Sequence, residues 1–189
     1  MSASTTSAHL AKLQHAGLIG AEARGRHRYF RLADAEVAHL LAALALVAER
    51  GSHERFWSCA GRAPLCHARC CYGHLAGRVG VALLRGLQAQ ACLQAQADNG
   101  FQLSDKGRAW LTHIGVPEPK VRPPQRLAYA CLDWSERRDH LAGVLPAALL
   151  KHFLARAWLV PGSTDAEQRN RALRLTPTGQ QALGGLLRL

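Results

Sequence analysis

Residues 4–32 read STTSAHLAKLQHAGLIGAEARGRHRYFRL, and this stretch decides the fold that we expect for the start of the chain. Residues 4–15 predict a helix, because Ser4 is a suitable N-cap and the segment has helical apolar spacing. Leu10 and Leu13 form the apolar stripe and are expected to face a core. One side of this helix is therefore expected to pack, and the other to face solvent or a partner.

Residues 18–32 predict a β-hairpin that turns at Gly25. The hairpin tip is rich in arginine, which suits a minor groove or its flanking phosphates. A solvated hairpin face is the alternative explanation. The preceding helix offers short hydroxyl groups near its N-terminus, which can reach base edges or phosphates. The candidate DNA-contacting residues are Ser4, Thr5, Thr6, Ser7, His9 and Lys12 on the helix and Arg24, Arg26 and Arg28 on the hairpin.

The same segment carries the pattern Ser-x-x-Ser-x-His-Leu-x-x-Leu-x-x-Ala-Gly-Leu-Ile, followed by Gly-Arg-x-Arg-Tyr-x-Arg-Leu. It resembles the recognition helix and wing of the ArsR/SmtB family of winged-helix transcriptional repressors. The resemblance implies a homodimer that binds double-stranded DNA at a pseudo-palindromic operator. Members of that family carry two or three helices before the recognition helix. We therefore expect either a misassigned start codon or a truncated gene.

Residues 35–50 predict a second helix, which Asp34 can cap and Gly51 can end. The helix is rich in Ala and Leu on several faces, and a helix this apolar usually buries two sides. The family resemblance makes it the dimerisation helix. Residues 51–69 contain Gly and Pro without periodicity and are expected to form a linker.

An internal repeat organises residues 70–189, with copies at about 71–116 and 131–189. The word His74-Leu75-Ala76-Gly77 recurs as His140-Leu141-Ala142-Gly143, and matched apolar positions follow in each copy. We expect the two copies to form a pseudo-two-fold module with one shared core. The region also resembles the extended C-terminal region of a long ArsR subgroup, a likeness that implies no particular ligand.

Each copy is expected to run through a helix, a turn and a short strand to a second helix, capped by Ser104 or Thr176. The expected fold class is therefore mainly α with small β-hairpins. The expected parts are a partial winged-helix DNA-binding unit at 1–34, the dimerisation helix at 35–50, the linker at 51–69 and a repeated helix/wing-like C-terminal module at 70–189.

Cysteine and histidine cluster in the pattern Cys66-His67-x-x-Cys70-Cys71-x-x-His74. Zinc and other thiophilic ions bind thiolate and imidazole ligands, and we expect Cys71 and Cys131 to be neighbours across the pseudo-two-fold. The spacing is not the paired C-x-x-C of a structural zinc site, so redox-active thiols and inert thiols stay open as alternatives. The candidate metal ligands are Cys66, Cys70, Cys71, His74 and Cys131, and the candidate effector ions are zinc, cadmium and lead.

Composition narrows the classes of function. The formal net charge is +11, which favours a polyanionic partner. No run of about 18 apolar residues is present, so we expect no membrane span. The start of the chain has no apolar leader, so we expect a cytoplasmic protein whose six cysteines are reduced. No nucleophile, base and orienting group form a catalytic set, so we expect no enzyme.

Two functions fit these features. The first is a dimeric transcriptional repressor that a small effector, such as a thiophilic metal ion, releases from DNA. The alternative is a dimerisation or metal- and thiol-sensing protein whose DNA-binding head is vestigial. Bound metal without retention on duplex DNA would favour the alternative.

Overall fold

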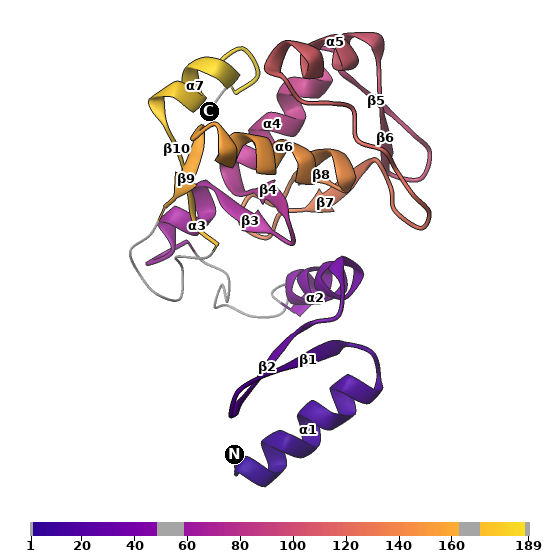
Figure 1. The fold of residues 1–189 in the computed structure, drawn as a ribbon, viewed down its shortest axis with the longest axis vertical. Helices are drawn as coiled ribbons and strands as arrows, with labels where there is room; N and C mark the ends of the chain where they lie inside the picture. The colour runs from indigo at the N-terminus through magenta and orange to yellow at the C-terminus, as the bar shows by residue number, and fades with distance from the viewer. Residues whose placement is uncertain (1, 49–58, 163–170, 188–189) are drawn as a thin grey trace. The chain divides into compact units, whose positions relative to one another are not determined.

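The chain divides into two compact units, Met1–His53 and Glu54–Leu189. The computed structural model describes residues 2–48, 59–162 and 171–187 (Figure 1). Each unit is described below by itself.

The N-terminal unit consists of two helices and a two-stranded antiparallel hairpin between them. Gly17 has φ +70°, and this left-handed residue ends α1 and turns the chain into β1. The hairpin register places Arg24 opposite His27, so a two-residue turn connects the strands, and Gly25 takes φ +60° at its first position. The elements are α1 Ala3–His15, β1 Ile19–Arg24, β2 His27–Leu32 and α2 Ala35–Ala48.

Side-chain caps set the starts of four helices. Asp34 accepts a hydrogen bond from a first-turn N–H of α2 at 2.9 Å, and Ser104 and Thr176 each do the same for a later helix at 3.0 Å. These three predicted caps are confirmed. The prediction of Ser4 as the cap of α1 is wrong, because the helix begins earlier and Ser2 caps it.

The C-terminal unit runs through hairpin, helix, hairpin and helix, and this order occurs twice after the short helix α3. Helix α3 is Ala63–His67. The first set is β3 Arg69–Cys71, β4 His74–Ala76, α4 Gly77–Ala89, β5 Leu93–Ala95, β6 Gly100–Leu103 and α5 Asp105–Ile114. The second set is β7 Ala128–Leu132, β8 Asp139–Ala142, α6 Val144–Ala155, β9 Leu159–Pro161, β10 Leu173–Leu175 and α7 Pro177–Leu183.

Strand pairing ties the two sets together at two places. β6 pairs with β7, so the hairpins β5–β6 and β7–β8 form one four-stranded antiparallel sheet. At the corresponding place, Arg69 of β3 forms a bridge with Ala172 just before β10. In both places, therefore, the second hairpin of one set pairs with the first hairpin of the other set.

One hydrophobic core fills the C-terminal unit. Its two central helices bury a stripe at i, i+4 and i+8, which is one face of a helix. The stripes lie at equivalent positions of the two sets, Val79, Leu83 and Leu87 on α4 and Leu145, Leu149 and Phe153 on α6. Each of these helices also contacts the hairpin that precedes it, α4 at β4 and α6 at β8.

The expected mainly α fold with a partial winged helix is wrong. Among the described residues, the chain forms four small antiparallel sheets, one of them four-stranded, together with the helices. Each set of the C-terminal unit begins with a β-hairpin, which the sequence pattern does not predict. These strands are three to five residues long and carry Ala, Cys and His rather than an alternating run of β-branched residues, so their periodicity is weak.

The described part of the segment 51–69, which was expected to be a linker, belongs to the C-terminal unit. Residues 49–58 lie outside the described part of the chain, and they include Gly51, the expected end of the second helix. Residues 63–67 form α3, and Arg69 is among the most buried side chains of the chain. This stretch contributes to the C-terminal unit, and its lack of helical periodicity reflects the shortness of α3.

Candidate functional site

Helix α1 presents the predicted DNA-contacting side chains to solvent. Ser2 Oγ lies 2.8 Å from Thr5 Oγ1, and Thr6 Oγ1 donates a hydrogen bond to the Ser2 carbonyl at 3.1 Å. These bonds hold hydroxyl groups around the first turn, where the helix dipole attracts anions. The exposed residues of the predicted set on α1 are Ser4, Thr5, Thr6, Ser7, His9 and Lys12.

The packing side of α1 is smaller than predicted. Leu10 is half-buried, but Leu13 is 40% exposed, so the prediction that both leucines face a core is wrong for Leu13. The helix lies against β1. It therefore has little apolar support of its own within the described N-terminal unit.

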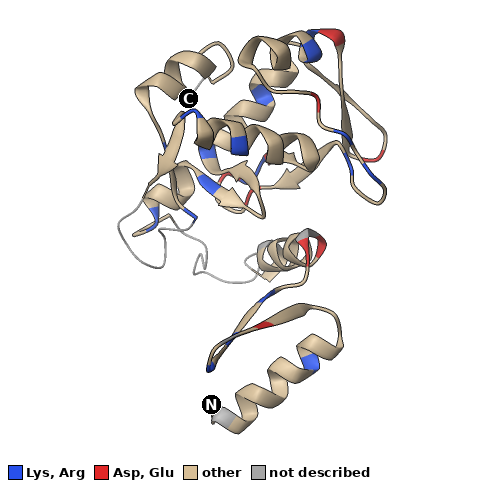
Figure 2. Cartoon of the chain, in the orientation of Figure 1, with Lys and Arg blue, Asp and Glu red and all other residues tan. Residues whose placement is uncertain are grey.

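The β1–β2 hairpin is the basic element of the N-terminal unit (Figure 2). It holds four arginines and one glutamate. Arg26 lies in the turn and Arg28 on β2, and both are exposed. Arg24 ends β1, but its side chain lies outside the described ones. Exposed arginines at a narrow two-stranded tip can contact phosphates or enter a groove.

An apolar stripe on α2 is exposed. Four of its residues are about half exposed although they are large and apolar. They fall at i, i+1, i+4 and i+7, so they share one face of the helix. These residues, here called the α2 stripe, are Leu40, Leu41, Leu44 and Val47.

Two hairpins of the C-terminal unit bring four potential metal ligands together. Cys71 lies opposite His74 across β3 and β4, and Cys131 lies opposite His140 across β7 and β8. Residues that are directly opposite in an antiparallel pair project from the same face. One ligand atom from each of the four residues lies within 4.8 Å of the others. We call this group the Cys/His cluster.

Turn geometry fixes the first of these hairpins. Tyr72 and Gly73 form a two-residue turn in which both residues have positive φ, +48° and +91°. This is the backbone sign pattern of a type I′ turn, which matches the twist of antiparallel strands. The turn places the Cys71 and His74 side chains at the closed end of the hairpin.

Burial and charge make the two thiols of the cluster unequal. A hydrogen bond from the Cys131 thiol lowers the pKa of Cys71 to about 4, against the opposing effect of burial, and the neighbouring imidazoles of His140 and His74 act in the same direction. The pKa of Cys131 is raised, because it shares that hydrogen bond with Cys71 and is itself buried. The shared hydrogen bond therefore favours loss of the proton from one thiol of the pair, Cys71, and opposes its loss from the other, Cys131.

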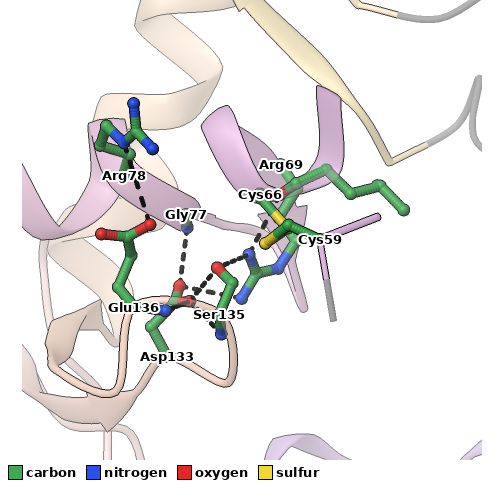
Figure 3. The surroundings of a disulfide bond; sticks show 9 residues. Cys59, Cys66, Arg69, Gly77, Arg78, Asp133, Ser135 and Glu136 are labelled. Atoms are coloured by element: carbon green, nitrogen blue, oxygen red, sulfur yellow. Dashed lines mark hydrogen bonds and ion pairs between the residues drawn. A yellow bond between two sulfur atoms is a disulfide. The ribbon is translucent and has the colours of Figure 1, made fainter. Parts of the chain in front are cut away.

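Asp133 lies beside the cluster at the centre of a buried polar network (Figure 3). Its Oδ2 accepts hydrogen bonds from Arg69 at 2.8 Å and from the Gly77 backbone N–H at 2.7 Å. Its Oδ1 accepts hydrogen bonds from the backbone N–H and the hydroxyl of Ser135 at 2.9 and 2.7 Å. The Arg69 guanidinium also stacks on Trp134, 4.5 Å from the ring centre. The network joins β3, the start of α4 and the β7–β8 loop.

Burial alone would raise the pKa of Asp133, but the Arg69 charge and the hydrogen bonds from Ser135 and Gly77 outweigh it and lower the pKa to about 2. His140 Nδ1 lies 3.4 Å from Asp133 Oδ2. Neither ring nitrogen of His140 has a hydrogen-bond partner in the described part of the chain, although its side chain is 1% exposed. The ionised carboxylate of Asp133 therefore lies next to the buried imidazole of His140, which belongs to the cluster.

The structure places three of the five predicted metal ligands in the cluster, Cys71, His74 and Cys131. Cys70 is the neighbour of Cys71 on β3, pairs with Leu75 and packs against the hydrophobic core. Cys66 forms a disulfide bond with Cys59 (Figure 3). The expectation of six reduced cysteines is therefore wrong, and Cys66 offers no free thiol as a ligand.

His140 is the cluster residue that the predicted ligand set omits. A signal for it exists in the sequence, because His140 and His74 open the repeated His-Leu-Ala-Gly word. Equivalent positions of a repeat occupy equivalent places in the fold. The repeat therefore identifies the second histidine once the first is considered.

No helix in the described part of the chain combines the length and apolar character needed to cross a membrane.

Comparison with known proteins gives one informative result. No protein-family model matches the chain, and no solved structure matches it. The chain is 38% identical over 179 residues to the uncharacterized HTH-type transcriptional regulator YdfF of Bacillus subtilis (strain 168). This similarity covers 94% of the chain and 76% of the relative. The chain therefore belongs to the family of this HTH-type transcriptional regulator.

Proposed function

We propose that the protein is a DNA-binding transcriptional regulator, a dimeric repressor of the ArsR type that a thiophilic metal ion releases from DNA. Its role is not enzymatic. Its similarity to an HTH-type transcriptional regulator over nearly the whole chain is the observation that carries the proposal. The sequence likeness to ArsR/SmtB proteins at residues 4–32 supports the repressor type.

The N-terminal unit has the surface that DNA contact requires. Its hairpin exposes Arg26 and Arg28, and its first helix exposes hydroxyl groups and Lys12 near the phosphate-attracting N-terminus. Short hydroxyl side chains reach base edges with little loss of side-chain entropy. In this proposal, α1 contacts bases and phosphates, and the hairpin contacts phosphates or the minor groove.

The α2 stripe is the proposed dimer contact. The large apolar residues of this stripe are half exposed on one helix face. Burying their exposed surface against a second copy would remove it from water and so stabilise the dimer. Two-fold packing of α2 would present two copies of α1 to a pseudo-palindromic site. The proposed effector, zinc, cadmium or lead, binds the C-terminal unit at Cys71, His74 and Cys131.

The contribution of the hairpin to DNA binding can be measured through its salt dependence. With a duplex of mixed sequence, the logarithm of the binding constant should fall linearly with the logarithm of salt concentration. Replacing Arg26 and Arg28 by alanine should reduce that slope by about 1 for each phosphate that is no longer neutralised, hence by about 4 in a dimer. Fluorescence anisotropy over a salt series measures the slope.

Lys120→Ala is the matched control, since it removes a cation from the C-terminal unit. Its slope should equal that of the wild type. A slope that both variants leave unchanged would contradict DNA contact by the hairpin. A wild-type protein that binds metal but no duplex at low salt would instead support the alternative function, a metal- and thiol-sensing protein with a vestigial DNA-binding head, which the Cys/His cluster favours.

A further inference from the structure

We infer that Cys71, His74, Cys131 and His140 form a closed, four-coordinate site for a zinc-class ion, Zn²⁺ or Cd²⁺. The inference adds His140 to the ligands and removes Cys66 and Cys70 from them. It deepens the proposed effector response and rests on the proposed function only for its consequence on DNA. The site itself depends on the geometry of two hairpins.

The donor set has the chemistry of a protein zinc site. Two thiolates and two imidazoles are the ligands of the common Cys2His2 class, and four protein ligands fill all positions of a tetrahedral ion. Hard cations such as Mg²⁺ and Ca²⁺ take oxygen ligands instead. No carboxylate belongs to the cluster of four, so the set selects a borderline or soft ion.

The donor atoms are close enough to meet one ion. They lie within 4.8 Å of one another. Bonds of about 2.0–2.3 Å to a tetrahedral ion require donor separations of roughly 3.3–3.8 Å. The donors must therefore draw in by about 1 Å at the widest pair. The backbone pairs Cys71 with His74 and Cys131 with His140 directly, so each hairpin already brings one thiol and one imidazole to the site.

His140 carries the second, independent sign of a ligand. Its imidazole is fully buried, and neither ring nitrogen has a hydrogen-bond partner in the described residues. A buried polar atom without a partner is costly, and an ion bound at one ring nitrogen removes that cost. The Nδ1 edge of the ring lies beside Asp133, with Nδ1 3.4 Å from the carboxylate oxygen Oδ2. A carboxylate behind a histidine ligand is the usual outer-shell arrangement of zinc sites.

A bound ion would cross-link the two sets of the C-terminal unit. One Cys–His pair comes from β3–β4 of the first set and the other from β7–β8 of the second set. Asp133 connects the same place to Arg69, and the Arg69 side chain donates to the Leu65 carbonyl of α3 at 3.1 Å. A chain of contacts through Asp133 and Arg69 therefore connects the site to α3, the first described helix of the C-terminal unit.

Cobalt substitution tests the ligand set on the full chain, without DNA. The protein is freed of metal and titrated with Co²⁺ without air and without a reductant, so that the Cys59–Cys66 disulfide stays intact. One equivalent should bind and give the intense visible bands of tetrahedral cobalt together with thiolate-to-cobalt charge transfer. Zn²⁺ should then displace it. Cys71→Ser and His140→Gln should weaken binding by more than the roughly 10–100-fold loss typical of outer-shell changes.

Cys70→Ser is the matched control, because Cys70 is adjacent to Cys71 in sequence but packs on the core side of β3. It should bind cobalt as the wild type does. Alkylation of the wild-type protein gives a second test that does not depend on whether the variants fold. Zn²⁺ should protect Cys71 and Cys131 from alkylation and leave the reactivity of Cys70 unchanged, and mass spectrometry measures the alkylation of each cysteine.

Binding that Cys70→Ser abolishes and His140→Gln retains would overturn the inference, as would the absence of a tetrahedral cobalt spectrum in the wild type. A protein that binds DNA but gives no such spectrum overturns this inference alone. A protein that gives the spectrum but binds no DNA keeps the site and overturns the proposed function.

Discussion

Replacing Asp133 by alanine is expected to lower the free energy of unfolding of the C-terminal unit by about 3–5 kcal/mol. Asp133 and Arg69 are 0% and 1% exposed, and their charged groups lie 2.8 Å apart. Removing the carboxylate leaves a buried guanidinium without its counter-charge, and it also frees the Gly77 N–H at the start of α4. Urea unfolding followed by circular dichroism measures the change.

An exposed pair of similar length provides the control. Asp98 lies 2.7 Å from Arg126, but the two side chains are 71% and 41% exposed. Because water screens such a pair, Asp98→Ala should cost at most about 1 kcal/mol. Equal losses from Asp98→Ala and Asp133→Ala would contradict the view that the Asp133 network holds the two sets of the C-terminal unit together.

Leu44→Asp is expected to convert the proposed dimer into a monomer. Leu44 is 54% exposed at the centre of the α2 stripe, and a two-fold contact would bury it once in each copy. Complete burial of an exposed leucine contributes about 1.5–3 kcal/mol, and Leu44 has about half of its surface left to bury, so losing two should raise the dimer dissociation constant by roughly 10-fold to 100-fold. Sedimentation equilibrium over a range of protein concentrations measures this constant.

Leu154→Asp serves as its control, because Leu154 is a leucine of the C-terminal unit with 42% exposure. This variant should associate as the wild type does. A wild-type chain that stays monomeric at the highest concentration, or a Leu44→Asp variant that stays dimeric, would contradict dimerisation through α2.

Local signals in the sequence predicted local structure well. Gly17 and Gly25 marked the end of α1 and the hairpin turn, and both adopt the positive φ that these positions require. Ser104 and Thr176 marked the helices that they cap. The prediction of Ser4 as the cap is wrong, because several hydroxyl residues lie near the start of the helix and the earliest of them, Ser2, is the cap.

The pairing of strands that lie far apart in the sequence could not be predicted from such local signals. The contact of β6 with β7 and the bridge at Arg69 depend on how two copies close around a common core, and three-residue strands carry too few positions for an alternating pattern. The sheets were therefore missed, although the repeat was visible.

The candidate metal site was predictable to the extent that it follows the repeat. The neighbourhood of Cys71 and Cys131 was expected from their places at the start of each copy, and His140 follows from His74 by the same symmetry. The prediction of Cys66 as a ligand is wrong, because Cys66 pairs with Cys59 across a stretch without periodicity, where no sequence pattern indicates that the two residues are close.

Selection of duplexes from a random-sequence library by the wild-type protein tests the central claim most directly, that this chain is a sequence-reading DNA-binding protein. The proposed function predicts enrichment of sequences with two related half-sites, spaced by about one helical turn or a multiple of it. The proposed function would be contradicted if the recovered duplexes showed no sequence enrichment and if the protein released all sequences equally as the salt concentration rises.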